Sequence, residues 1–360
     1  MVVTRQFYKY ILALLGFTFL MASCALVGKR YEHFDDVPLE SVAVSNEDSI
    51  EFPEPKDIAF DIKRLRSLDF GKDTLNRNAV LEQVFNKQID PDDWNYNDFY
   101  DLTYWKCSTC KKVSILDENQ SYADQLVYEK LPLEINYTQL IGQLDFQGSN
   151  EKSYSLLSFS TGPDYELTGR FVSGMLSLAL MEKTDSWKIK QFNLVVNYQG
   201  SFQKASGIDT LIELPNGEPL FVGYGGVANG VSAEDYWPIY ENLYCYDFHD
   251  LKETIKLQNA VCWINGDVDL GSKWHTQIVG SSIVEGQQQI TFLTSGRIDK
   301  ERMWGLPDGI TEQVYNQLAK ISNFELKQTF AFVDNKWTAI KTVLESWTNH
   351  PNKRQTFVIL

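Results

Sequence analysis

The sequence predicts a mainly β protein, with antiparallel sheets in a sandwich or propeller-like arrangement, a few short helices and an extended N-terminal tether. From about residue 131 onward, short segments of alternating apolar and polar residues recur, with Gly, Asn and Asp between them. Aromatic residues make up 13% of the chain, and such residues are enriched in strands. The alternative is an α+β fold, because two segments have helical periodicity.

The predicted strands follow one another through the second part of the chain. The first is LPLEINYTQL, in which apolar and polar residues alternate. The dipeptide Asn216-Gly217 is the strongest hairpin signal, because both residues tolerate the backbone of a tight two-residue turn. The later strands are YSLLSFS, GMLSLALME, WKIKQFNLVVNY, DTLIELP, EPLFVGY, HTQIVGSSIVE, QQQITFLTSGRI and NFELKQTFAFV.

Two segments predict helices. Residues 73–88 have apolar side chains at helical spacing, and Asp73 can cap the first turn. Residues 311–321 place Val314, Leu318 and Ile321 on one face. The apolar face of the first helix consists of Val80, Leu81, Val84 and Phe85.

Composition and patterning divide the chain into five regions. Acidic residues and prolines without sustained periodicity precede the first helix, which is typical of an extended linker. The regions are a lipoprotein signal peptide at 1–23, a flexible tether at 24–56, a small mixed α/β segment at 57–130, a mainly β globular domain at 131–348 and a C-terminal tail at 349–360.

The N-terminal residues have the three parts of a secretory signal. Arg5 and Lys9 supply positive charge, an apolar run follows from Ile11 to Ala22, and small residues precede Cys24. The run is short for a membrane span, which needs about 20 apolar residues. The four residues Met21-Ala22-Ser23-Cys24 resemble the lipobox of bacterial lipoproteins. This resemblance implies cleavage before Cys24, a diacylglycerol thioether and an N-acyl chain on that cysteine, and a lipid bilayer as the partner.

Residue Ala25 indicates which membrane would hold the protein, and the net charge indicates which partners are not expected. In Gram-negative envelopes an Asp after the lipidated cysteine resembles an inner-membrane retention signal, so Ala25 favours the outer membrane, facing the periplasm or the cell surface. Loss of Arg5 and Lys9 with the signal takes the formal net charge from −15 to −17. Because nucleic-acid binding depends on Lys and Arg neutralising phosphates, no nucleic-acid partner is expected.

Four cysteines follow Cys24, and an even number in an exported chain predicts two disulfides. The favoured pair is Cys245 with Cys262, since closing a loop of this length contributes roughly 3 kcal/mol in the chain-entropy account. Cys107 and Cys110 would then close a very short ring. Two alternatives are a C-x-x-C redox motif and a zinc site made from all four thiolates.

The best candidate for ligand binding is a cluster of aromatic residues between positions 224 and 246. Flat rings can stack on sugars while their OH and NH groups bond hydroxyls. The alternative is that these rings pack the core. The candidate residues are Tyr224, Tyr236, Trp237 and Tyr240, with Tyr244 and Tyr246 beside them.

Catalytic and cofactor motifs give no support for an enzyme. The chain has no H-E-x-x-H or G-x-S-x-G, and its Gly-rich segment at 223–230 lacks the order of a phosphate-binding loop and predicts an ordinary loop. No cofactor or metal is expected. The sequence therefore predicts a membrane-anchored cell-envelope lipoprotein that acts as a non-enzymatic binding or structural module. The alternative is a carbohydrate-binding or glycan-active envelope enzyme. Besides the bilayer, the expected partner is a glycan or an envelope protein.

Overall fold

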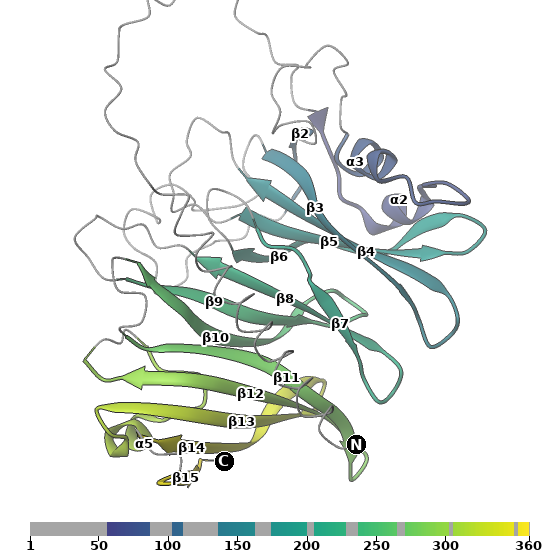
Figure 1. Cartoon of the computed structure of the whole chain (residues 1–360). Coiled ribbons are helices and arrows are strands. Elements are labelled where there is room, and N and C mark those ends of the chain that lie inside the picture. Colours follow the sequence, from purple (N-terminus) through teal and green to yellow (C-terminus); the bar gives the residue numbers. More distant parts are fainter. Residues whose placement is uncertain are drawn as a thin grey trace, which may run out of the picture. The chain divides into compact units, whose positions relative to one another are not determined.

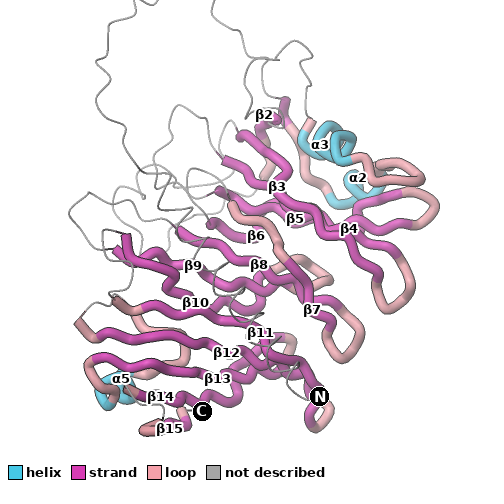
Figure 2. Tube along the Cα trace, viewed as in Figure 1, coloured by secondary structure: helices cyan, strands magenta, loops and turns pink. Residues whose placement is uncertain are grey.

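The computed structural model describes residues 56–86, 103–110, 136–162, 174–199, 205–227, 237–264, 271–301, 305–348 and 352–359. All of them belong to one compact unit, residues 54–360. The signal peptide, Cys24 and nearly all of the predicted tether lie outside the described residues. The described chain is mainly β, as the sequence predicts, with two largely antiparallel sheets and a few short helices (Figure 1, Figure 2).

The first sheet contains six strands in sequence order. Every neighbouring pair is antiparallel except β1 and β2, which run parallel. The predicted segments 57–130 and 131–348 share this sheet, because β2 pairs with β3. Its strands are β1 (Lys56–Asp57), β2 (Thr103–Lys106), β3 (Asn136–Gln147), β4 (Ser153–Gly162), β5 (Gly174–Lys183) and β6 (Trp187–Gln199).

The second sheet contains nine strands in a continuous antiparallel meander. The registered contact between β10 and β11 is the single pair Ala260–Trp274, so the two halves of the sheet diverge there. The last strand belongs to the predicted C-terminal tail. The strands are β7 (Thr210–Glu213), β8 (Pro219–Val227), β9 (Trp237–Tyr246), β10 (Glu253–Ile264), β11 (Lys273–Val284), β12 (Gln287–Asp299), β13 (Ile321–Val333), β14 (Lys336–Trp347) and β15 (Gln355–Val358).

The helices are short, and one predicted cap is wrong. Helix α3 (Arg77–Phe85) begins later than predicted, and Asn76, not Asp73, caps it: the Asn76 side-chain oxygen accepts a hydrogen bond from the Ala79 amide at 3.1 Å. Helix α5 (Glu312–Gln317) is capped by Thr311 and ends before the predicted limit, because the chain turns into β13. Helix α2 (Ile62–Ser67) lies before α3.

Both faces of the first sheet are covered, which explains the unbroken burial of β4 and β5. On one face, Phe85 of α3 packs with Phe159 of β4 in one apolar core. On the other face, neighbouring residues such as Leu156 join Phe221 of β8 and Tyr246 of β9 in a second core. In β4 and β5, the period of two assigns odd and even residues to different cores.

The second sheet buries two further cores. One contains Val222 and Leu243 from β8 and β9 together with Phe292 of β12. The other contains Phe324 of β13 and Leu318, which directly follows α5, so the segment around this helix covers that part of the sheet. Strands β8 and β9 therefore contribute side chains to a core on each of their faces.

The hairpin signal at Asn216-Gly217 is confirmed. The turn joins β7 to β8, but it has three residues, Pro215 to Gly217, rather than two: the Leu214 amide donates to the Glu218 carbonyl at 2.8 Å, and Gly217 alone of the three has a positive φ, at +81°. Strands β9 and β10 were not among the predicted strands. The predicted loop at 223–230 is wrong for its first part, because Gly223–Val227 lie in β8.

Candidate functional site

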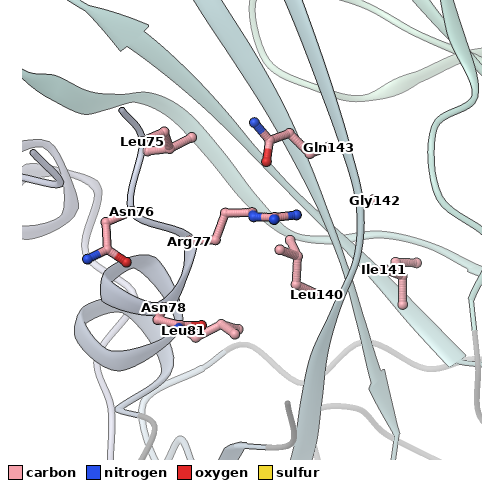
Figure 3. A pocket seen from close by; sticks show the side chains of 9 residues that line it. All are labelled: Leu75, Asn76, Arg77, Asn78, Leu81, Leu140, Ile141, Gly142 and Gln143. Carbon is pink, nitrogen blue, oxygen red and sulfur yellow. The ribbon is translucent and has the colours of Figure 1, made fainter. Parts of the chain in front are cut away.

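A hollow of about 470 Å³ lies between the start of α3 and β3 (Figure 3). Asn76 stands at its rim with its oxygen already used in the helix cap. Gly142 lies where the β3–β4 register shifts, so the strand bends beside the hollow. The residues that line it are Leu75, Asn76, Arg77, Asn78, Leu81, Leu140, Ile141, Gly142 and Gln143.

The lining of this hollow can donate hydrogen bonds to an acceptor. Arg77 extends toward β3 between Leu140 and Gln143 (Figure 3). Its guanidinium and the neighbouring amides suit oxygen acceptors. None of these residues was predicted as a site residue, because helix starts with an Asn cap and an Arg at the first position are ordinary features of surface helices.

The structure places the aromatic residues of the predicted binding site in different surroundings, and some of them lie outside the described side chains. Tyr224 is half-buried, stacks on His275 with ring centroids 5.5 Å apart, and donates its hydroxyl to the Thr276 carbonyl at 3.3 Å. Tyr244 and Tyr246 pack in the core between the two sheets. For these three rings, packing explains the burial better than ligand contact does. Tyr236 lies outside the described residues, and Trp237 and Tyr240 are described only by their backbone in β9.

Polar groups beside Tyr224 link β8, β9 and β11. Asp209 accepts a hydrogen bond from the Tyr224 amide at 3.0 Å. Glu241 lies opposite Asn259 across β9 and β10, and burial, followed by the charge of Asp209, raises the pKa of its carboxyl. The oxygen of Asn259 accepts from the Thr276 amide at 2.8 Å, while its amide nitrogen is buried without a partner in the described chain. The two hydrogen bonds both satisfy backbone amides, so the group serves the structure of the sheet.

The predicted disulfide between Cys245 and Cys262 is wrong. Cys245 is a free, buried thiol. Cys245 pairs with Ile255 across β9 and β10, whereas Cys262 pairs with Ile239. Six residues along β9 separate the two positions, which is about 20 Å at roughly 3.3 Å per residue. Disulfides need Cα atoms within about 7 Å, so this register excludes the bond.

The second predicted disulfide, between Cys107 and Cys110, is present with a Cα–Cα distance of 5.4 Å. It follows β2, and Cys107 is buried in the core under α2 and α3. The bond excludes a zinc site made of four thiolates. Ser108 lies inside this loop, and both its amide and its hydroxyl donate hydrogen bonds to the exposed carboxylate of Asp57 in β1. These two hydrogen bonds lower the pKa of the Asp57 carboxyl.

An apolar row is exposed where the β11–β12 and β13–β14 hairpins end. Ile283 pairs with Gln288, and Phe332 pairs with Trp337 on the neighbouring hairpin. Their side chains share the face that carries buried Phe292 farther along β12. Ile283 is 53% exposed and Phe332 is 41% exposed, with the Phe332 and Trp337 rings 5.4 Å apart. This row, which we call the hairpin-end row, comprises Ile283, Phe332 and Trp337.

No protein-family model, curated protein or solved structure matches this chain. Within the described ranges, no helix has the length and apolarity to cross a membrane. The same ranges contain no cluster of His, Cys, Asp or Glu side chains placed to hold a metal ion.

Proposed function

We propose that the chain is a lipid-anchored protein of the cell envelope, held at the outer membrane by acyl chains on Cys24. The support is the sequence Met21-Ala22-Ser23-Cys24 after a charged and apolar leader. Several acyl chains hold a protein firmly, because each buried CH₂ contributes roughly 0.8 kcal/mol. The partner of the anchor is the bilayer.

The anchor is tested by Cys24→Ser with membrane sedimentation and intact mass. The wild type should sediment with membranes and carry lipid mass, whereas the variant should remain uncleaved or lose the lipid. Cys262→Ser is the matched control, since it changes a cysteine far from the leader. Equal processing and equal lipid mass in wild type and Cys24→Ser would refute the anchor.

We further propose that the mature protein is a non-enzymatic binding or structural module. The observation that carries this proposal is the hairpin-end row, in which Ile283 and Phe332 expose apolar surface on one face and the Phe332 ring packs against Trp337. Water-exposed aromatic and aliphatic side chains gathered on one face are typical of interaction surfaces. A partner protein of the envelope would bury this row.

Site-specific photo-crosslinking in intact cells tests this binding role. A photoreactive residue at Phe332 should give a discrete adduct that unlabelled full-length protein suppresses. The control position is Lys327, which is exposed in the same strand but points to the other face. The absence of an adduct at Phe332, or equal adducts at both positions, would refute a specific surface there.

A further inference from the structure

The first described strand is attached to the C-x-x-C loop. Strand β1 pairs in parallel with the end of β2, and the Ile58 amide donates to the Lys106 carbonyl at 2.8 Å. The Asp57 carboxylate accepts one hydrogen bond from the Ser108 amide at 2.9 Å and one from the Ser108 hydroxyl at 2.5 Å. The chain that leads to Cys24 therefore enters the sheet at a contact made by the disulfide loop itself.

The two cysteines of this loop differ in exposure. Cys107 is 5% exposed and belongs to the core under α2 and α3, whereas Cys110 packs against the same core but is only partly buried. Ser108 and Thr109 between them are exposed. An external thiol can therefore reach the bond from the Cys110 side, while Cys107 stays packed against the sheet.

We propose that the Cys107–Cys110 bond is a site of reversible thiol–disulfide exchange. The disulfide holds, and its reduction loosens, the β1 junction, by which we mean the pairing of β1 with β2 and the Asp57–Ser108 hydrogen bonds. A dithiol reductant attacks Cys110 and forms a mixed disulfide, and Cys107 leaves as a thiolate that takes a proton. The second thiol of the reductant then displaces Cys110, so the reductant ends as its own disulfide and the loop as two thiols. Without the bond, Ser108 regains backbone freedom and Asp57 loses its fixed donors.

The effect of reduction is confined to the junction. Cys107 as a thiol still packs as a small apolar side chain, and α3, β4 and β5 contribute many buried side chains to the surrounding core. The cores of the second sheet contain no residue of the loop. This inference does not require the lipid anchor or the hairpin-end row, so it can fail without affecting either.

Hydrogen exchange of the detergent-solubilised full chain tests this exchange site, with dithiothreitol as the dithiol. Reduction should add about 2 Da and speed exchange of the Ser108 amide at least about tenfold, the change expected for loss of a hydrogen bond to a charged group. Exchange of the Ile58 amide should speed as well, because its bond to the Lys106 carbonyl adjoins the loosened loop. Amides of β12 and β13 should keep their rates. Reoxidation with glutathione disulfide should restore both the mass and the protection.

Two variants distinguish a disulfide that controls only the pairing of β1 with β2 from one that stabilises the whole fold. Cys107→Ser with Cys110→Ser should show the fast exchange without reductant. Asp57→Asn should speed Ser108 exchange with the disulfide intact, because the Ser108 amide loses its charged acceptor, and it should speed Ile58 exchange because the neighbouring pairing of β1 with β2 loosens. A bond that resists dithiothreitol in the folded protein would overturn the proposal. Loosening of all strands together, or unchanged Ile58 exchange after reduction, would also overturn it.

Discussion

Truncation of Phe85 gives the sharpest test of how the helices are held on the first sheet. The Phe85 side chain is fully buried, and its ring contacts the rings of Phe60, Trp105, Phe159 and Phe192 at centroid distances of 5.7, 6.1, 5.0 and 6.1 Å. Phe→Ala at a buried site costs about 3–5 kcal/mol. Since aromatic pairs add roughly 0.5–1.5 kcal/mol beyond burial and are not additive, we expect about 4–5 kcal/mol.

Urea unfolding followed by tryptophan fluorescence measures this loss, because Trp105 lies against the truncated side chain. Phe85→Ala should lower the free energy of unfolding by an amount comparable to a third or more of a typical total of about 5–15 kcal/mol. Val358→Ala is the control, since Val358 is 74% exposed and should change stability by less than about 0.5 kcal/mol. A loss below about 1.5 kcal/mol for Phe85→Ala would show that the helices do not depend on this core.

Three further predictions concern single groups. Burial alone would raise the pKa of the Glu182 carboxyl, but hydrogen bonds and charge from Lys152 and its neighbours lower it. Its contribution to stability is thus present above the unfolded pKa and lost as pH falls through the folded pKa, so Glu182→Gln should flatten the pH dependence of urea midpoints below about pH 4.5. Burial strongly raises the pKa of the Cys245 thiol, so iodoacetamide at pH 8 should label it only after unfolding, as mass spectrometry can show. Gly217→Ala should cost about 1–2 kcal/mol in thermal unfolding, because Gly217 has a φ of +81° and a Cβ there would meet the Ser149 Cβ at 2.9 Å.

Alternation along the chain predicted most strands, but it missed β9 and β10 and the short strands β1, β2 and β15. In β9, Leu243 and Cys245 face the core with β12, whereas Tyr244 and Tyr246 face the core between the sheets. Because β9 contributes apolar side chains to a core on each face, apolar residues do not alternate with polar ones along it, and the period of two is lost there. This explanation does not extend to β10, where Lys256 is exposed between buried Ile255 and Leu257. The burial of β9 also explains why tyrosines in this region resemble an aromatic binding site when they are read without a structure.

The cysteine pairing shows a second limit. The C-x-x-C pair is fixed by local chain length, so a single sequence can predict it. Whether Cys245 meets Cys262 depends on the register of β9 against β10, and that register contains bulges at positions the sequence does not mark. Likewise, Asp57 and Ser108 are far apart in the chain, and no sequence pattern predicts the hydrogen bonds between them.

The hairpin-end row lies where the apolar alternation of β13 continues past the part of the strand that other elements cover. In β13, Phe324, Leu326 and Phe332 share a face, so alternation alone treats them as equal parts of the core. The segment around α5 covers the first two, which are fully buried, while the last is 41% exposed. How much of this face of the sheet is covered depends on where α5 and β7 pack. The sequence of β13 does not determine that packing. Strands buried on both faces have no surface left for a partner, so the uncovered end of β13 is where binding by this sheet should be sought.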